Sequence, residues 1–495
     1  MKLLNRLKML GAATKKADES GPLVSELRTV LDPKRVCYDG ASRTLLSRDA
    51  SVFEGGAAGP VCYPTSTDEV QALVAVANKH NASIVPRGAG TGIAGGAIPL
   101  GKPIVVALNK MNKVKEVDLE NRIAWVEAGV VNLDLSNQLR PLGYHFAPDP
   151  SSQVVCTIGG NVANNAGGPH CLAYGVTDAH VVAIEVVMPS GEVVVLGSLE
   201  AEPLGYDLRG AFVGGEGTLG IMTKVAVRLT KIPPAVRTML LSFSSIHDAA
   251  TTVSDVIAAG IVPAALEVMD QRITTCVEDF VNAGYPRDAA AVLLAEVEGL
   301  PGGVELDAKR ISEIGVDNGA TNVRTAQTEQ ESQLLWKGRK AAFGAIAQVN
   351  PDYYLHDTVV PRSKLADVLE EIYEIADRYD LLVMNLFHAG DGNLHPLLSF
   401  DARNEGVIER VHAAGEEILR AAVKAGGVLS GEHGIGVEKQ KFMDVMFTSD
   451  DMDHQNRLRK SFDPNCRANP GKILPTGHSC ADIAALRKIP TGVWG

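Results

Sequence analysis

Three long glycine-rich segments lie between residues 86 and 221, and they constrain the fold of this chain more than any other feature. The segments are PRGAGTGIAGG from Pro86, TIGGNVANNAGG from Thr157 and VGGEGTLGI from Val213. Glycine has no Cβ, so glycine-rich backbone can turn tightly and can approach a ligand closely. Because many of the 49 glycines of this 495-residue chain gather in this way, the three segments predict loops that surround a ligand.

The first segment contains Gly90-Thr91-Gly92-Ile93-Ala94-Gly95, which has the spacing of a dinucleotide-binding fingerprint. That fingerprint requires a strand, a tight turn and a helix in this order. A strand is expected at residues 83–85, but the residues after Gly95 read GAIPLG and do not favour a helix. The segment therefore argues against a nicotinamide Rossmann site. Its unobstructed backbone N–H groups, together with Arg87, suit a pyrophosphate.

Hydrophobic periodicity predicts a mixed α and β organisation. Ser66 and Glu69 have capping-box spacing ahead of a helix that should end near Lys79. Strands are expected at 83–85, 104–108 and 123–130, and a hairpin over 181–196 that turns at residues 189–191. Alternation of apolar and polar residues predicts a half-buried strand at 221–229. A domain boundary is expected near residues 231–234. A second α+β region should follow, with helices near 248–259, 305–314 and 364–379.

Composition excludes several classes of function. The net charge of −12 argues against a general nucleic-acid binder, which needs a basic face. The 7 cysteines form no C-x-x-C pair, so zinc ribbons and iron–sulfur clusters are not expected, and the wide spacing favours free thiols in a reducing compartment. No apolar run is long enough to span a membrane. The basic N-terminus MKLLNRLKMLGAATKK lacks the apolar stretch of a secretory signal and reads as a docked helix or a membrane-surface segment.

Two histidines in the sequence FHAGDGNLHP suggest a metal site. Asp391-Gly392 is a strong signal for a two-residue hairpin turn, which would place His388 directly opposite His395 on one sheet face. Glu432 and His433 follow in SGEHGIG, where flanking glycines allow both side chains to point inward. His388, His395 and Glu432 would then form a two-histidine, one-carboxylate set that suits zinc or a first-row metal.

The glycine-rich segments resemble the FAD-binding signatures of the vanillyl-alcohol oxidase/p-cresol methylhydroxylase superfamily, in which such loops wrap the pyrophosphate and the isoalloxazine. Members with covalent flavin use a histidine or cysteine in these loops. The first segment has neither, although Cys156 and Cys171 lie near the second, so the FAD is expected to be non-covalent. The resemblance implies that the residues contacting FAD are Pro86, Arg87, Gly88, Ala89, Gly90, Thr91, Gly92, Pro148, Thr157, Gly159, Gly160, Asn161, Asn164, Gly220 and Ile221.

The histidine motifs resemble the C-terminal domain of FAD-linked D-lactate, D-2-hydroxyglutarate and glycolate dehydrogenases. This resemblance implies that His388, His395 and Glu432 hold a divalent metal, with zinc as the first choice, and that His433 is the general base. The stretch from Trp336 to Arg339 resembles the W-x-x-R of these enzymes, so Arg339 would bind the substrate carboxylate. Enzymes acting on D-2-hydroxyglutarate place a lysine where this chain has Leu355-His356-Asp357, which favours a substrate with one carboxylate.

Within this group the chain is most similar to glycolate oxidase flavoprotein subunits, over about residues 20–485 and through PDYYLHDTVVPRSKL, FHAGDGNLHPLLSFD, SGEHGIGVEK and NPGKILP. The implied fold is α+β: a two-lobed FAD-binding domain of the p-cresol methylhydroxylase type plus a ferredoxin-like α+β substrate (cap) domain. We accordingly divide the chain into an N-terminal helical segment (1–54), the FAD-binding domain (55–232), the FAD-linked oxidase C-terminal substrate domain (233–476) and a tail (477–495).

The implied activity is FAD-dependent oxidation of a small 2-hydroxy acid, glycolate or D-lactate, to the 2-keto acid. With no iron–sulfur or haem motif in the sequence, electrons must pass to an external acceptor. The resemblance implies a second flavoprotein-like subunit and an iron–sulfur subunit as partners, no nucleic acid, and a cytoplasmic chain that is peripheral at the inner membrane through these subunits. The alternatives are a standalone D-lactate dehydrogenase with a quinone or cytochrome acceptor, and an FAD-binding scaffold subunit without its own chemistry.

Overall fold

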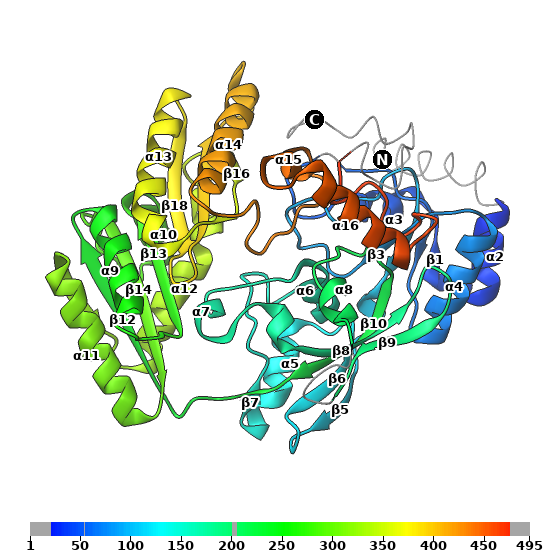
Figure 1. Ribbon diagram of the computed structural model, residues 1–495, viewed down its shortest axis with the longest axis horizontal. Coiled ribbons are helices and arrows are strands. Elements are labelled where there is room, and N and C mark those ends of the chain that lie inside the picture. Colours follow the sequence, from blue (N-terminus) through cyan, green and yellow to red (C-terminus); the bar gives the residue numbers. More distant parts are fainter. Residues whose placement is uncertain (1–20, 54, 200–204, 476–495) are drawn as a thin grey trace, which may run out of the picture.

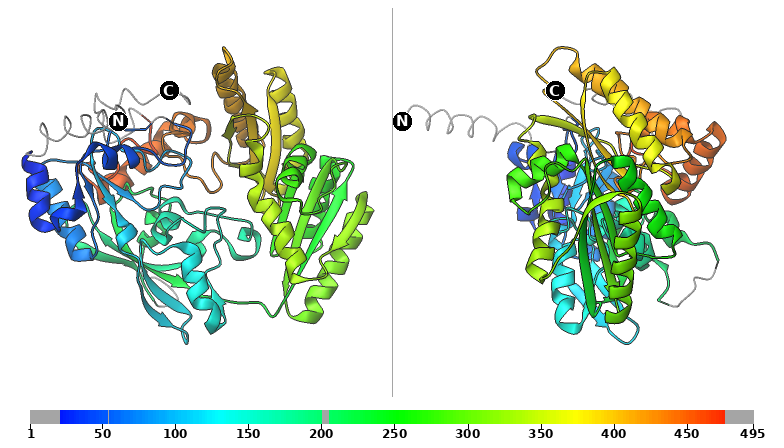
Figure 2. Two further views of the ribbon diagram at one scale, coloured as in Figure 1. Left: turned by 180° about the vertical axis from the view of Figure 1, so that it is seen from behind. Right: turned by 90° about the vertical axis from the view of Figure 1, so that its left-hand side faces the viewer.

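The computed structural model describes residues 21–53, 55–199 and 205–475 of the chain. These residues form two bodies that stand side by side (Figure 1). The first holds a four-stranded and a five-stranded sheet, and the second, which we call the cap, holds an eight-stranded sheet. The view from behind shows the same two bodies (Figure 2). The first domain also contains a two-stranded sheet of β7 and β11. These sheets with their helices, and the helix-covered sheet of the cap, confirm the α+β fold class.

The element bounds follow the chain in three stretches. The first domain contains α2 (Pro22–Val30), β1 (Val36–Cys37), α3 (Gly40–Leu45), β2 (Val61–Cys62), α4 (Thr67–Lys79), β3 (Ile84–Arg87), β4 (Ile104–Ala107), β5 (Val114–Asp118), β6 (Ile123–Glu127), α5 (Asn132–Leu139), β7 (Tyr144–His145), α6 (Ile158–Asn164), α7 (Cys171–Tyr174), β8 (Val181–Val187), β9 (Val193–Gly197), α8 (Leu208–Phe212), β10 (Ile221–Arg228) and β11 (Thr230–Lys231). The cap contains β12 (Ala235–Phe243), α9 (Ile246–Ala258), β13 (Ala265–Asp270), α10 (Gln271–Val281), β14 (Ala291–Gly299), α11 (Pro301–Asp317), β15 (Ala320–Thr325), α12 (Glu329–Ile346), β16 (Asp352–Leu355), β17 (Thr358–Val359), α13 (Leu365–Arg378), β18 (Leu382–His388), β19 (Asn393–Phe400) and α14 (Val407–Lys424). The helices α15 (Met443–Met446) and α16 (Ser449–Phe462) follow.

The small sheet of the first domain delivers the chain to the first glycine-rich segment. Helix α4 begins after Ser66, whose side chain accepts a hydrogen bond from the backbone N–H of Glu69, as the capping pattern predicts. Strand β3 follows and pairs parallel to β4. No helix lies between β3 and β4 in this fully described stretch, so the first segment is a loop rather than the turn of a Rossmann site.

The larger sheet positions the other two glycine-rich segments. The predicted hairpin is present as β8 and β9. The third segment leads directly into β10, which pairs with both β6 and β8. Part of the second segment forms α6 rather than a loop, and this helix lies against the end of β6. A Cβ on Gly159 would lie 2.8 Å from the carbonyl oxygen of Ala128, so only glycine permits this approach.

The cap is built around one antiparallel sheet whose strands run β15-β12-β14-β13-β18-β19-β16, and the eighth strand, β17, also pairs with β19. Its first four strands, numbered in chain order, therefore lie in the order 4-1-3-2 of a ferredoxin-like unit. Met239, Leu241 and Phe243 of β12 pack into a core with α9, α11, α13 and α14. Leu240 points the other way, into a core with α10 and α12, as the two-residue period of a strand requires.

After the cap the chain returns to the first domain. Helix α16 lies beside the sheet that contains β3 (Figure 1), and Ala468 forms a parallel bridge with Ile84. The side-chain amide of Asn469 donates to the carbonyl oxygens of Gly96 and Glu216, which belong to two different glycine-rich segments. Residues near the C-terminus of the described chain therefore hold these two segments together.

Two further expectations concern the ends of the chain and the state of the cysteines. The basic N-terminal segment and the tail from residue 477 lie outside the described residues. Five cysteines are free as expected, namely Cys37, Cys62, Cys156, Cys171 and Cys276. Cys466 is disulfide-bonded, so the expectation of free thiols was wrong at this position, because spacing along the chain does not show which residues meet in space.

Candidate active site

A cavity of about 300 Å³ lies between the first domain and the cap. One wall comes from the glycine-rich segments and the other comes from cap residues, including Arg339, His388 and His395. Glu432 and His433 line it as well. The structure thus gathers both motif groups that the sequence singled out into a single site, although residues 86 and 433 are far apart in the chain.

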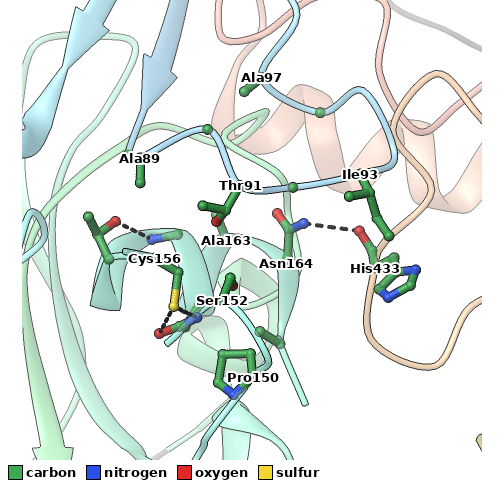
Figure 3. Close-up of a pocket in the computed structure, with 18 of the residues that line it drawn as sticks. Ala89, Thr91, Ile93, Ala97, Pro150, Ser152, Cys156, Ala163, Asn164 and His433 are labelled. Carbon is green, nitrogen blue, oxygen red and sulfur yellow. Dashed lines mark hydrogen bonds between the residues drawn. The ribbon is translucent and has the colours of Figure 1, made fainter. Parts of the chain in front are cut away.

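The wall of the first domain carries most residues expected to contact FAD (Figure 3). Those that line the cavity are Pro86, Arg87, Gly88, Ala89, Gly90, Thr91, Gly92, Thr157, Gly159, Gly160, Asn161, Asn164 and Gly220. Pro148 and Ile221 do not line it. The carbonyl oxygen of Pro148 accepts a hydrogen bond from Asn132, and Ile221 packs into the hydrophobic core of the first domain.

Arg87 is the cation of this wall. Its side chain is buried, and its Nε and Nη1 atoms have no hydrogen-bond partner. Burial lowers the pKa of the guanidinium. An unpartnered buried cation is costly, so Arg87 fits a site that receives an anionic group such as a pyrophosphate. Cys156 also lines the cavity, and its thiol exchanges hydrogen bonds with the Asn161 side chain.

The predicted hairpin carries His388 and His395, but its register differs from the expectation. His388 pairs with Asn393, and His395 pairs with Leu386. The direct pairing of the two histidines was wrong because the connection spans residues 389–392, with Gly392 at a φ of +81°. Since Leu386 and His388 are alternate residues of β18, both histidines still occupy one sheet face. Their ring centroids lie 5.1 Å apart.

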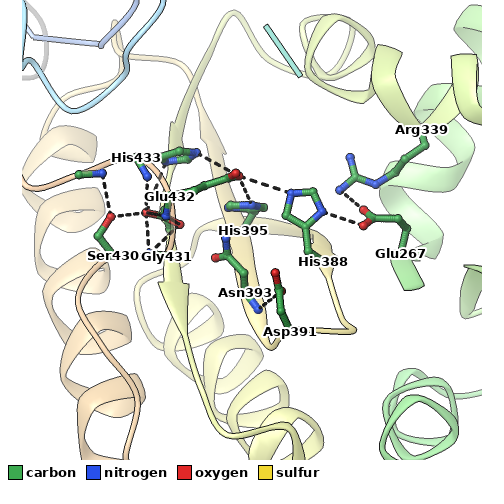
Figure 4. A network of polar contacts seen from close by, with 12 residues as sticks. Glu267, Arg339, His388, Asp391, Asn393, His395, Ser430, Gly431, Glu432 and His433 are labelled. Atoms are coloured by element: carbon green, nitrogen blue, oxygen red, sulfur yellow. Dashed lines mark hydrogen bonds and ion pairs between the residues drawn. The ribbon is translucent and has the colours of Figure 1, made fainter. Parts of the chain in front are cut away.

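Three side chains converge as a candidate metal centre (Figure 4). Glu432 Oε1 lies 3.4 Å from His388 Nε2 and 3.1 Å from His395 Nε2. Suitable ligand atoms of the three residues all lie within 4.8 Å of one another. Two ligands bound tetrahedrally at about 2.1 Å would be about 3.4 Å apart, so the spacing and the donor set fit a divalent metal such as zinc.

The charges of this centre follow from burial and from neighbouring groups. Burial would raise the pKa of Glu432, but His388 and His395 lower it well below its ordinary value. Burial would lower the pKa of His388, but the carboxylates of Glu267 and Glu432 raise it well above its ordinary value. For His433 burial dominates and lowers the pKa to about 4, against the opposite effect of Asp357.

The loop that carries Glu432 and His433 is held from both sides. From the cap, the Asp357 carboxylate accepts hydrogen bonds from the backbone N–H groups of residues 431, 432 and 433 and forms a 3.1 Å ion pair with Lys439. From the first domain, Glu216 accepts hydrogen bonds from the N–H groups of Ile435 and Gly436. Asp357, His395 and His433 could also surround a metal, but these bonds already occupy the Asp357 carboxylate.

Arg339 approaches the centre from α12. Its guanidinium forms a 2.6 Å ion pair with Glu267, and both side chains are almost fully buried, at 2% and 0% exposed. The Nε atom of Arg339 has no hydrogen-bond partner. Three further cap residues that line the cavity are Phe343, Tyr353 and Leu355. This side of the cavity offers one cation, Arg339, and mainly apolar side chains, so it suits a small ligand with a single carboxylate.

A second set of polar contacts joins the first domain to α12. His170 lies between two carboxylates, 2.9 Å from Asp149 and 3.3 Å from Glu296 of the cap. Trp336 donates from its indole N–H to Glu296 and lies beside the His170 ring. The Trp336 side chain therefore helps to fix α12, and with it Arg339, against the first domain.

Sequence reasoning missed Glu267, Asp357 and Glu216 as contributors to this site. Asp357 belongs to the stretch Leu355-His356-Asp357, which the sequence analysis considered only because it lacks the lysine of enzymes that act on D-2-hydroxyglutarate. Glu267 stands between apolar residues inside the buried strand β13, which ends at a second carboxylate, Asp270, and a charge inside an apolar run is the signal that could have indicated it. Glu216 stands within the third glycine-rich segment, whose glycines indicate backbone contacts and give no signal for a buried carboxylate.

Comparison with known proteins decides the family. Residues 59–197 match the model of an FAD binding domain, and residues 232–473 match the C-terminal domain of FAD linked oxidases. The chain is 45% identical over 426 residues to the glycolate oxidase subunit GlcD of Escherichia coli (strain K12), covering 86% of this chain and 85% of that protein. The chain belongs to the FAD-linked oxidases.

Other relatives of this FAD-linked oxidase are similar over most of their length. The D-lactate dehydrogenase of Anaerostipes hadrus is 33% identical over 451 residues, which cover 89% of this chain and 95% of that protein. A solved structure of p-cresol methylhydroxylase with substrate bound shares the fold, with a TM-score of 0.78 at 18% identity and coverage of 92% and 96% of the two chains.

Membership makes the chain an FAD-dependent oxidoreductase, and the glycine-rich wall of the cavity is the part that fits the cofactor. In the described part of the chain, every helix is too short or too polar to pass through a lipid bilayer.

Proposed function

We propose that this FAD-linked oxidase oxidises a small 2-hydroxy acid, glycolate or D-lactate, to the 2-keto acid. One observation carries the proposal: a single cavity joins the glycine-rich FAD wall to a buried arginine, two histidines and the Glu432-His433 pair. The two named relatives, a glycolate oxidase subunit and a D-lactate dehydrogenase, support the same substrate class.

The charged and imidazole side chains on the cap side of the cavity each have a role in this reaction. Arg339 binds the substrate carboxylate, because a guanidinium pairs with it in two-point geometry and its Nε still lacks a partner. His388, His395 and Glu432 would hold a divalent metal, with zinc as the first choice. When bound, non-covalent FAD would accept the α-hydrogen together with its two electrons, as hydride, and the metal would act as a Lewis acid toward the α-hydroxyl. His433 takes the hydroxyl proton as general base.

The cavity lining supports a substrate with one carboxylate. Among the cavity-lining residues, all of which are described, the arginines are Arg87 in the FAD wall and Arg339 in the cap, and no lysine is present. A second carboxylate beside Arg339 would face Phe343, Tyr353 and Leu355. Burying a charge without a partner is costly, so D-2-hydroxyglutarate should react poorly.

The electron acceptor is external to this chain. Because the Escherichia coli relative is named as a subunit of glycolate oxidase, we propose a second flavoprotein-like subunit and an iron–sulfur subunit as partners. In this proposal the chain works in the cytoplasm, at the inner face of the membrane. A standalone D-lactate dehydrogenase is the second candidate, supported by the relative from Anaerostipes hadrus.

Anaerobic bleaching of the flavin tests the proposal directly. Glycolate, D-lactate, L-lactate and D-2-hydroxyglutarate are each added to the purified protein with FAD and metal present. We expect glycolate or D-lactate to bleach the flavin rapidly, and the faster of the two decides between the candidates. If none of the four bleaches it, the chain does not oxidise these acids by itself and the scaffold alternative gains support.

A further inference from the structure

Glu267 is a buried carboxylate that faces the candidate metal centre from the cap sheet. It stands in β13 and is the register partner of His388 in β18. Directly opposed residues of neighbouring antiparallel strands point to the same face, which here is the face covered by α10 and α12. The side chain of Glu267 is 0% exposed, so its charge depends on protein groups alone.

The two oxygens of Glu267 contact two different residues (Figure 4). Oε1 lies 2.7 Å from His388 Nδ1, and Oε2 lies 2.6 Å from Arg339 Nη2. Oε1 is thus hydrogen-bonded, whereas Oε2 forms no hydrogen bond and is stabilised by the ion pair with the Arg339 guanidinium. One side chain therefore joins a residue expected to bind the substrate to a residue expected to bind the metal.

The contact with His388 decides which nitrogen of the imidazole is free. In the neutral imidazole that a metal requires, a proton on Nδ1 donated to Glu267 leaves the lone pair on Nε2, the nitrogen that lies 3.4 Å from Glu432. A carboxylate that accepts from a metal-binding histidine fixes the tautomer and the ring orientation, and it makes the ligand more basic. Glu267 stands in that relation to His388.

The contact with Arg339 decides how the guanidinium is turned. Glu267 engages one Nη atom, while Nε remains buried and without a hydrogen-bond partner. Because the guanidinium is planar and rigid, holding one nitrogen restricts the direction of the others. The remaining donors are thereby kept for a carboxylate in the cavity.

We propose that Glu267 is a positioning residue that couples the carboxylate-binding arginine to the metal-binding histidine. The proposal rests on the proposed function, since it takes Arg339 and His388 in those two roles. Its consequence is that one change at position 267 weakens metal binding and substrate binding together. If the Glu267 carboxylate only neutralised the charge of Arg339, its replacement would leave the metal affinity unchanged.

The test measures metal affinity in the FAD-loaded protein by competition between Zn²⁺ binding and a chromophoric chelator. The variants are Glu267→Gln, which removes the charge and keeps the size, and Glu267→Asp, which keeps the charge and shortens the reach. The matched control is Glu278→Gln, because Glu278 is also a buried cap carboxylate but accepts only from backbone N–H groups of residues 283–285.

We expect Glu267→Gln to bind Zn²⁺ roughly 10- to 100-fold more weakly than the unchanged chain, which is the usual effect of losing such a partner. Its KM for the substrate that bleaches the flavin should rise as well. Glu267→Asp should recover part of the metal affinity, and Glu278→Gln should keep all of it. The flavin absorbance of each variant shows whether the FAD site has folded.

Two results would overturn the proposal for Glu267. One leaves the proposed function standing, and the other contradicts its metal centre as well. If Glu267→Gln retains FAD and binds Zn²⁺ within twofold of the unchanged chain, the coupling is wrong while the proposed function stands. If Glu267→Gln does not fold, unchanged metal affinity in Glu267→Asp has the same meaning. If the unchanged chain itself fails to bind Zn²⁺, the metal centre of the proposed function is wrong and the coupling falls with it.

Discussion

The side-chain amide of Asn164 donates a 3.0 Å hydrogen bond to the backbone carbonyl oxygen of His433. Asn164 ends the helix α6 in the FAD wall, and His433 belongs to a loop that follows the cap. Figure 3 shows this bond between the side chain of Asn164 and the backbone of His433, both of which line the cavity. The backbone of the residue expected to accept the substrate proton is therefore bonded to the helix that is expected to face the flavin.

Replacement of Asn164 by alanine should lower turnover without abolishing it. A hydrogen bond of this kind contributes roughly 1 kcal/mol, and a loop displaced by its loss should lower kcat by about five- to tenfold. Steady-state kinetics with the substrate that bleaches the flavin measures this effect. Asn121→Ala is the control, because Asn121 is bonded only within an exposed turn. Equal kcat values for the two variants would mean that the bond to His433 does not position the loop.

Replacement of His433 by glutamine should remove the general base. We expect kcat to fall by roughly 10²- to 10⁴-fold, the usual contribution of such a group, while FAD content and metal content stay unchanged. The control is His454→Gln on the surface helix α16, where the imidazole contacts only a backbone carbonyl. Near-normal turnover in His433→Gln, with FAD bound, would show that another group accepts the proton.

Removal of the metal should stop the reaction and leave the flavin in place. Treatment with a strong chelator should abolish substrate-dependent bleaching, and added Zn²⁺ should restore it, because the ligand set and the FAD wall are separate parts of the cavity. His395→Ala should resist this restoration, since it lacks one of the three ligands. Full activity of metal-depleted protein, verified by elemental analysis, would contradict a metal-assisted reaction.

Replacement of Arg339 by lysine should weaken substrate binding more than flavin binding. Lysine cannot reproduce the two-point contact of a guanidinium, and a charged hydrogen bond contributes roughly 1.5–3 kcal/mol. We therefore expect kcat/KM to fall by about 10- to 100-fold, with normal flavin absorbance. Lys337→Met on the same helix is the comparison, because that residue does not line the cavity. A loss of the same size in both variants would indicate general damage to α12.

His170 should make the stability of the protein depend on pH on the alkaline side. Burial would lower the pKa of His170, but Asp149 and Glu296 raise it well above the ordinary value of 6.5. A raised pKa means that the folded state holds the proton more tightly, so this stabilisation is full below pH 6.5 and is lost as pH rises through the folded-state pKa. The other charged groups near these carboxylates are Lys340 and Glu298.

The measurement is the urea midpoint of unfolding at several pH values from 6.5 upward. The midpoint of the unchanged chain should fall with pH more steeply than that of His170→Gln. His247→Gln is the control, because His247 and its partner Glu370 are both exposed. Parallel midpoint curves for the unchanged chain and His170→Gln would show that the proton on His170 does not contribute to stability.

Local signals predicted much of the secondary structure. Ser66 and Glu69 marked the start of α4 because capping depends on residues that are neighbours in the chain. The hairpin of β18 and β19 was also predicted, but its register was not. Asp391-Gly392 is a local turn signal, whereas the pairing of His388 with Asn393 also depends on neighbouring strands, since β18 pairs with β13 as well.

The sequence by itself determined the types of residue that the site uses: glycine-rich segments, two histidines, an arginine and a Glu-His pair. It also determined the family, because these motifs are short and contiguous. Only the tertiary structure decided that Glu267 joins Arg339 to His388 and that Asn164 holds His433. The physical reason is that charges buried in different elements must find partners across space, and no spacing along one chain records which elements pack together.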